Sequence, residues 1–212
     1  RNHSEYDFEM IYFNSDGNIS SMCGNGGRCI VGFAKHLGII DDKCTFLAAD
    51  GFHSAKISDN KVSLSMNNVS SIESLGNKVF ILDTGSPHYV TIVDDVRKVN
   101  VKKEGAMIRN SKRFIEEGIN VNFLQIADFP IIRSYERGVE NETLSCGTGT
   151  VACAIVSHKI NGNNLEDGTT FVQKVITQGG DLEVKFIVKK NIYTGIYLGG
   201  SFNPVFSGSV IC

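Results

Sequence analysis

Two cysteines that directly precede glycine-rich segments are the residues of this chain best suited to chemistry. Residues 22–29 read Met-Cys-Gly-Asn-Gly-Gly-Arg-Cys, and residues 144–150 read Leu-Ser-Cys-Gly-Thr-Gly-Thr. An apolar segment suited to a buried helix follows each. Because a helix N-terminus presents free N–H groups, it binds a carboxylate and lowers the pKa of a nearby thiol. We therefore expect Cys23 and Cys146 to reach the thiolate form near neutral pH and, where they face each other, to act as a base and an acid.

The other four cysteines fit the ordinary role of a small, buried apolar side chain. They are Cys29, Cys44, Cys153 and Cys212. The spacings between cysteines exceed those of the usual zinc knuckle, so we expect no structural metal. Six cysteines among 212 residues also do not make a disulfide-dense secreted scaffold, and we expect free thiols.

The elements that must position these thiols follow from the apolar pattern and the turn residues. One helix is expected from Cys23 to near Gly38, another after Cys146, and a mixture of loop and helix over residues 97–115. The expected strands are residues 6–13, 44–48, 52–57, 62–66, 79–83, 89–93, 120–126, 131–135, 170–176, 181–188, 192–198 and 204–211.

One arrangement occurs twice along the chain. An apolar strand ends in a polar turn, and a cysteine-glycine helix follows. Asn14 lies nine residues before Cys23, and Arg137 lies nine residues before Cys146. A duplicated α+β unit explains this repeat better than chance.

The repeat predicts two lobes. The polar segment 67–78 is the expected crossing between them, with the boundary near Ser70. Residues 1–69 would form the first lobe together with residues 203–212, whose strand would return to it, and residues 70–202 would form the second lobe.

Composition excludes several classes of protein. Lys and Arg total 21 against 23 Asp and Glu, a formal charge of −2, which gives no electrostatic footprint for nucleic acid or an anionic membrane. We find no apolar run of membrane-spanning length and no signal peptide. We expect a soluble cytoplasmic protein.

The second glycine stretch also satisfies the dinucleotide-binding pattern G-x-G-x-x-A, from Gly147 to Ala152, with Glu166 and Asp167 near the spacing of a ribose ligand. In that pattern the glycines directly follow a strand, yet here eight residues separate Arg137, at the end of the expected strand, from Cys146. No alternation of strands and helices follows, which disfavours a nucleotide site. Neither stretch ends in Lys-Ser or Lys-Thr, which excludes a P-loop.

Three further residues suit a binding site. His88 follows a Gly-Ser-Pro turn; a lone histidine is more often structural, but this loop favours a functional role. Glu136 and Arg137 end a strand and could be a solvated pair. An arginine beside a carboxylate-binding helix is also well shaped to grip a second carboxylate in bidentate fashion.

Together these motifs resemble the diaminopimelate epimerase family, whose members act without pyridoxal phosphate. The matching stretches run in family order: Asn-Ser-Asp-Gly at 14–17, the cysteine motif at 22–29, Gly-Ser-Pro-His at 85–88, Asn-Val-Asn-Phe at 120–123, and Tyr-Glu-Arg-Gly to Ser-Cys-Gly-Thr-Gly at 135–149. The resemblance implies an α+β fold of two pseudo-symmetric lobes. Each would be a curved, mostly antiparallel sheet around a central helix, with the active site in the cleft between them.

The resemblance also implies roles for individual residues. Cys23 and Cys146 would be the acid and base, while His88 and Glu136 would orient the thiols and the substrate amine. The α-carboxylate would be held at the helix N-termini by Gly24, Asn25, Gly147 and Thr148. The distal end of the substrate would be held by Asn14, Asn120 and Arg137, with Ser86 where the family usually has asparagine.

The implied reaction is the epimerisation of LL-diaminopimelate to meso-diaminopimelate, in lysine and cell-wall precursor biosynthesis. It would need no cofactor, its partner would be a small-molecule substrate, and a homodimer would be compatible with it. The family's N-terminal His-Gly-x-Gly-Asn-Asp-Phe segment is absent, as though about fifty residues preceded Arg1. The sequence leaves open whether an isolated chain without that segment is active.

Three other functions remain open. Proline racemases and hydroxyproline epimerases share Cys-Gly-Thr-Gly-Thr, but they normally carry histidine in place of Asn25, and Arg137 favours a substrate with a second charged end. A catalytically silent binding protein would keep the same scaffold. A nicotinamide-dependent oxidoreductase is the third and least favoured function.

Overall fold

The structure is a computed structural model that describes residues 4–14, 17–19, 22–161 and 167–209. Within these residues the strands join in one mixed sheet, in the order β1-β2-β3-β4-β13-β12-β11-β9-β8-β7-β6-β5, with β10 beside β9. The strands are β1 Phe8–Glu9, β2 Lys43–Ala48, β3 Gly51–Ser58, β4 Lys61–Ser65, β5 Ile72–Leu75, β6 Val79–Asp83, β7 Pro87–Ile92, β8 Asn120–Gln125, β9 Ile131–Glu136, β10 Asn141–Thr143, β11 Thr170–Thr177, β12 Gly180–Lys189 and β13 Ile192–Ser201. The helices are α1 Gly24–His36, α2 Val101–Arg109 and α3 Gly147–Asn161, with a short 3-10 helix η1 at Val96–Lys98.

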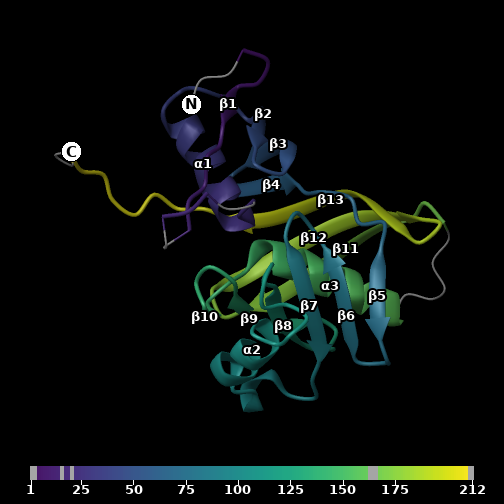
Figure 1. Cartoon of the computed structure of the whole chain (residues 1–212). Helices are drawn as coiled ribbons and strands as arrows, with labels where there is room; N and C mark the ends of the chain where they lie inside the picture. The colour runs from purple at the N-terminus through teal and green to yellow at the C-terminus, as the bar shows by residue number, and fades with distance from the viewer. Residues whose placement is uncertain (1–3, 15–16, 20–21, 162–166, 210–212) are drawn as a thin grey trace.

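The sheet divides into two lobes, which lie one above the other in Figure 1. The first lobe contains α1 and β1 to β4, and the second contains β5 to β12 with α2 and α3. Strand β13 joins them, because it pairs with β12 in the second lobe and residues Tyr197–Ser201 pair with β4 in the first. The α+β class is confirmed. The boundary near Ser70 and the place of residues 203–212 in the first lobe stay predictions.

Helix α3 is the centre of the second lobe. Its residues 147–158 are all buried, and it contacts β6 to β9 on one side and β11 to β13 on the other. The sequence explains this, because α3 is apolar or small around its whole circumference for three turns, and such a helix must be enclosed. Its basic residues, His158 and Lys159, come only in its last turn.

Strand β8 is buried on both faces, because α3 and α2 both pack against it. Side chains of a strand alternate between faces. Val121 and Phe123 belong to a small core with α2 and η1, whereas Leu124 belongs to the main core with α3. The alternation therefore directs Asn120 and Asn122 toward α3.

Four expectations about the elements were wrong. The first strand is Phe8–Glu9 rather than 6–13, and β5 and β10 form in segments where no strand was expected. Residues 202–209 form no regular structure, so the expected strand 204–211 is absent over its described part; Val205 and Phe206 are 88% and 89% exposed. Residues 210 and 211 lie outside the described part of the chain. Cys29 is exposed rather than buried, while Cys44 and Cys153 are buried as expected; Cys212 lies outside the described residues.

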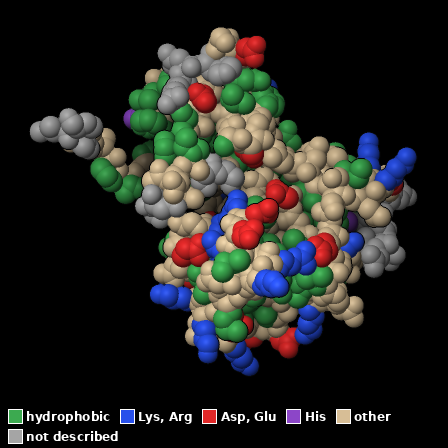
Figure 2. All heavy atoms as spheres, viewed as in Figure 1, with side chains coloured by type: hydrophobic (Ala, Val, Ile, Leu, Met, Phe, Trp, Pro, Cys, Tyr) green, Lys and Arg blue, Asp and Glu red, His purple; other side chains and the backbone are tan. Residues whose placement is uncertain are grey.

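Charges of both signs are interspersed over the second lobe on the face shown in Figure 2, which also shows apolar side chains gathered on the first lobe. None of the helices described is long and apolar enough to cross a membrane.

A buried ion pair marks the contact between the lobes. His53 is fully buried, and its ring nitrogens lie 2.8 Å from the Ser65 carbonyl oxygen and 2.9 Å from Asp50 Oδ1. Because a carbonyl and a carboxylate only accept hydrogen bonds, both nitrogens donate and His53 is an imidazolium. Burial acts to lower the pKa of His53, but the hydrogen bonds to Asp50 and Ser65 outweigh it and raise that pKa.

The same carboxylate reaches the second lobe. Asp50 Oδ2 accepts a hydrogen bond of 3.0 Å from Asn67 Nδ2, and a Cβ added at Gly85 would lie 2.6 Å from that oxygen. Gly85 has a φ of 97°, a left-handed conformation that favours glycine. The ion pair of the first lobe therefore packs against the turn that carries Ser86.

We predict that Asp50→Asn destabilises the protein more at pH 6 than at pH 9. A histidine whose pKa is raised by folding stabilises the protein fully below its unfolded pKa of about 6.5, and this stabilisation is lost as the pH rises through the folded pKa. At pH 6 the substitution should cost about 1–3 kcal/mol of unfolding free energy, measured by urea unfolding. Asp42→Asn, in the exposed pair with Lys35, should show no such pH dependence. Equal losses from Asp50→Asn at both pH values would show that His53 is uncharged.

Candidate active site

The N-termini of α1 and α3 touch. A Cβ added at Gly147 would lie 2.9 Å from the Cα of Gly24, and one added at Gly24 would lie 3.2 Å from the Cα of Gly147. Asn25 Nδ2 also donates a hydrogen bond of 2.7 Å to the carbonyl oxygen of Ser145, across the junction. Side chains at both glycines would force the two backbones apart, so the glycines permit this contact.

Four backbone N–H groups gather at the junction. The first backbone hydrogen bonds of the two helices run from Gly27 to Cys23 and from Thr150 to Cys146, both at 2.8 Å. The N–H groups that precede these bonds have no acceptor within their own helix. They include those of Gly24, Asn25, Gly147 and Thr148. Two positive helix ends at one place form a site suited to an anion such as a carboxylate.

The two cysteines stand beside the junction in different environments. Cys23 is the N-cap of α1 and is half-buried; its Sγ accepts a hydrogen bond of 3.3 Å from the Gly26 N–H. Cys146 is 2% exposed. Burial and the nearby Glu136 carboxylate raise the pKa of Cys146 well above its ordinary value, although Thr148 and the Gly149 N–H oppose this. The expectation of a readily formed thiolate was therefore wrong for Cys146, which the site holds as a thiol.

Tyr12 joins the same cluster, although it was not predicted from the sequence. Burial raises the pKa of Tyr12 to about 12, with further contributions from a hydrogen bond and charge interaction with Cys23 and from charge interactions with Glu136 and Cys146. These neighbours come from both lobes. The sequence could have predicted this place for Tyr12. Residues two apart in an extended segment face the same side, and Tyr12 lies two residues before Asn14, an expected site residue.

A group of polar side chains lies at the ends of β8 and β9. Asn120 Nδ2 donates to Ser86 Oγ at 2.9 Å, and the Arg137 N–H donates to Asn120 Oδ1 at 3.1 Å. Arg137 Nη2 lies 3.4 Å from the same Ser86 oxygen. Asn14 of the first lobe contacts Gly138, the residue after Arg137. The structure thus brings together the four residues expected at the distal end of the substrate.

Glu136 is the last residue of β9, and Arg137 follows it directly. Burial lowers the pKa of Arg137, helped by Arg109 and opposed by Asp83 and Glu117, but a guanidinium stays charged at any working pH. Glu136 accepts a hydrogen bond from the Thr143 hydroxyl. The site therefore presents a fixed cation next to hydroxyl and amide groups.

His88 and Thr148 connect this group to α3. His88 is fully buried on β7, and burial together with Arg137 lowers its pKa to about 3, so it is neutral at physiological pH. The Thr84 hydroxyl donates 3.0 Å to the carbonyl oxygen of Thr148, whose own hydroxyl lies 3.6 Å from Cys146 Sγ. All twelve residues singled out from the sequence lie around the helix junction, and their roles stay predictions.

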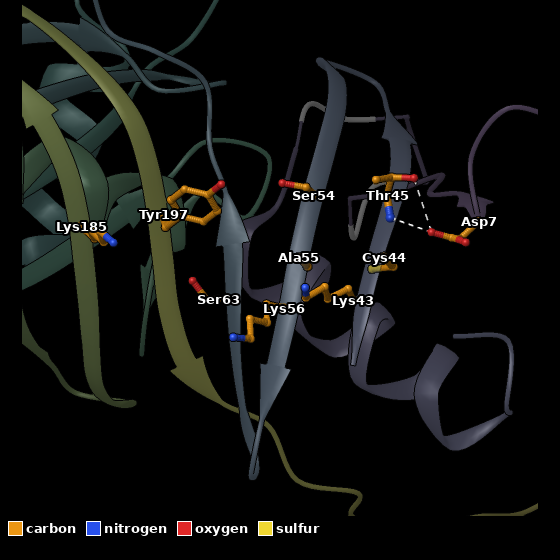
Figure 3. A pocket seen from close by; sticks show the side chains of 10 residues that line it. All are labelled: Asp7, Lys43, Cys44, Thr45, Ser54, Ala55, Lys56, Ser63, Lys185 and Tyr197. Carbon is orange, nitrogen blue, oxygen red and sulfur yellow. Dashed lines mark hydrogen bonds between the residues drawn. The ribbon is translucent and has the colours of Figure 1, made fainter. Parts of the chain in front are cut away.

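A separate hollow lies on the outer face of the first lobe's sheet, away from α1 (Figure 3). It has a volume of about 640 Å³ and is lined by lysines and hydroxyl groups, among them Lys43, Lys56, Lys185, Ser54 and Tyr197. None of the expected site residues lines it. No group of three or more His, Cys, Asp or Glu side chains that could hold a metal occurs in the described part of the chain.

We predict that Gly147→Ala costs about 1–3 kcal/mol of unfolding free energy, because its methyl group meets the backbone of Gly24, which cannot rotate away. Gly199→Ala is the control, since a Cβ there meets nothing closer than 3.5 Å; it should stay within about 0.5 kcal/mol of wild type in urea unfolding. If both variants are equally stable, the two helix ends do not touch.

Comparisons with known proteins find relatives over nearly the whole chain. The family model for diaminopimelate epimerase matches residues 80–201. The diaminopimelate epimerase of Flavobacterium psychrophilum is 47% identical over 215 residues, covering 99% of this chain and 80% of that protein. The enzyme of the same name from Aquifex aeolicus is 41% identical, covering 96% of this chain and 75% of its own length.

Solved structures share the fold at low sequence identity. A phenazine biosynthesis protein of the PhzF family from Bacillus anthracis has a TM-score of 0.73 at 11% identity, over 94% of this chain and 79% of that one. A probable proline racemase from Agrobacterium radiobacter has a TM-score of 0.67 at 17% identity, over 100% of this chain and 74% of that one. At these identities the likeness establishes the two-lobed fold alone. The relatives by sequence establish more: the chain belongs to the diaminopimelate epimerase family.

Proposed function

We propose that this chain interconverts LL- and meso-diaminopimelate by a two-cysteine acid–base mechanism without a cofactor. Its family membership makes it an isomerase. The observation that supports the mechanism is the junction of α1 and α3, where two helix N-termini touch and a cysteine precedes each helix. Inverting a carbon requires a base on one face and an acid on the other, and two opposed thiols supply both.

The reaction can be written with its protons balanced. The Cys23 thiolate takes the α-proton, and the electron pair of the broken C–H bond stays on the α-carbon and spreads into the carboxylate. The Cys146 thiol then gives its proton to the opposite face of that carbon. Cys23 ends as a thiol and Cys146 as a thiolate, and the reverse reaction exchanges the two roles.

The environments of the two sulfurs support this assignment of roles. The raised pKa of Cys146 keeps its proton in the resting site, while Cys23 accepts a backbone N–H at its sulfur. The N–H groups at the two helix ends would stabilise the charge that builds on the carboxylate in the transition state. Each group is fixed by its helix, so little reorganisation is needed during the reaction.

The distal group supports diaminopimelate as the substrate. Diaminopimelate carries a second amino-acid end, and a half-buried arginine beside Ser86, Asn120 and Asn14 suits its carboxylate and amine. Proline and hydroxyproline have no such second charged end. Isomerisation of those substrates is the alternative, and a silent binding protein on the same scaffold is a second.

Location and assembly belong to the same proposal. The mechanism needs free thiols, which the cytoplasm maintains, and we infer a cytoplasmic enzyme of lysine and cell-wall precursor synthesis. A homodimer stays a prediction.

We predict that Cys23→Ser and Cys146→Ser each lower kcat for diaminopimelate epimerisation by at least about a hundredfold, because each removes a proton carrier that serine replaces poorly. Cys29→Ser is the matched control, since Cys29 lies on α1 but is exposed; it should keep near-normal turnover. The readout is the change in optical rotation of diaminopimelate with the intact protein.

Either active-site variant turning over at a near-normal rate would defeat the mechanism. Proline offered in parallel tests the alternative substrate. Absence of solvent exchange at the α-proton of diaminopimelate in the wild-type protein would identify a silent binding protein.

A further inference from the structure

Asn122 connects His88 to the helix that follows Cys146; it lies within the Asn-Val-Asn-Phe motif, but the mechanism above gives it no role. It lies on β8, where its side chain is fully buried. Asn122 Nδ2 is 3.0 Å from His88 Nδ1, and Asn122 Oδ1 accepts a hydrogen bond of 2.8 Å from Ser134 Oγ. A Cβ added at Gly149, in the first turn of α3, would collide with Asn122 Oδ1. The carboxamide is therefore held on three sides.

The neighbours of Asn122 decide which end of the amide faces the histidine. The Ser134 hydroxyl can donate or accept, so it fits either orientation. The carbonyl oxygen of Tyr89 can only accept, and it lies 3.4 Å from Asn122 Nδ2. The NH₂ end of the amide therefore points toward Tyr89 and His88, and His88 Nδ1 is the acceptor.

An acceptor nitrogen carries no proton, so the ring proton of neutral His88 sits on Nε2. His88 Nε2 is buried and has no hydrogen-bond partner among the described residues. Burial and the nearby Arg137 hold the pKa of His88 near 3, so the ring does not gain a second proton near neutral pH. The site thus contains one buried, unpaired N–H donor whose tautomer is fixed by a neighbouring amide.

This tautomer limits what His88 can do. A general base needs a free lone pair, and the one ring lone pair available for a proton is on Nδ1, where the Asn122 amide occupies it. The free Nε2–H can donate a hydrogen bond to a ligand atom that bears a lone pair. A carboxylate oxygen of an amino-acid substrate is such an atom.

We propose that Asn122 is a positioning residue that holds His88 as a neutral hydrogen-bond donor through Nε2, so that His88 serves the substrate as a donor and not as a base. The part about the substrate rests on the proposed function. The part about the tautomer depends only on the folded protein, so a spectrum tests the tautomer and kinetics test the role toward the substrate.

The tautomer is read from the ¹H–¹⁵N spectrum of intact protein labelled at histidine ring nitrogens, with the His88 signals assigned by their loss in His88→Gln. We expect Nδ1 to give the signal of an unprotonated nitrogen and Nε2 that of a protonated one, unchanged from pH 5 to pH 8. Asn122→Asp replaces the donor by an oxygen that only accepts, and it should move the proton to Nδ1 or charge the ring. A wild-type His88 that is protonated at Nδ1, or that titrates in this range, would overturn the proposal.

The catalytic part is tested with the same variant. Asn122→Asp should lower kcat by about a hundredfold, the loss typical of removing one aligned donor, and should introduce a histidine ionisation into the pH profile of kcat. Ser134→Ala is the control, because Ser134 contacts the other end of the same amide and not His88; it should keep the wild-type tautomer and a kcat within about tenfold of wild type. A switched tautomer with unchanged kcat would refute the role of His88 as a donor.

The proposal stays testable if Asn122→Asp fails to fold. The wild-type spectrum alone decides the tautomer, and Asn122→Ala supplies the kinetic comparison without a buried charge. Both proposals are supported if the cysteine variants are inactive and the wild-type protein shows the expected His88 tautomer. Active cysteine variants would contradict the proposed function and the role of His88 toward the substrate, but not the tautomer.

Discussion

The structure depends on the contact between the N-termini of α1 and α3 at Gly24 and Gly147. Two helix N-termini can come into backbone contact only where neither carries a side chain. Two positive helix ends repel each other. Their approach is compensated by the hydrogen bond from Asn25 to Ser145 and by the sheet that holds both helices. An anion placed between them would relieve that repulsion, so the feature that is costly in the fold is the one that we propose binds a carboxylate.

The rest of the fold holds the junction in place. Helix α3 is enclosed by the second lobe, and α1 packs on β4 and β13, the strands at which the sheet passes from one lobe to the other. Because β13 pairs with both β12 and β4, the two helices are positioned by one continuous set of backbone hydrogen bonds. The contact of Asp50 with Gly85 adds a second link, close to the residues expected at the distal end of the substrate.

The helix junction could be predicted from sequence because the glycines that it requires directly follow the two cysteines in the chain. Interactions across the fold could not. Tyr12 near Cys23, Asn122 beside His88 and the pair of Asp50 and His53 all depend on strand register and on how the lobes meet. The raised pKa of Cys146 was missed for the same reason, since its burial and its distance from Glu136 are set by tertiary packing. Residues 204–209 include the apolar pair Val205 and Phe206 but have no neighbouring strand to pair with in the described structure.

Isotope incorporation tests the central claim, that two thiols act on opposite faces of one carbon, most directly. LL-diaminopimelate is converted in D₂O by the intact enzyme, and the inverted carbon is analysed by mass spectrometry during the first few per cent of reaction. Two separate proton carriers predict that the meso product carries solvent deuterium at that carbon while the remaining LL substrate does not. A product that retains the original proton would require a single base serving both faces, and would contradict the account.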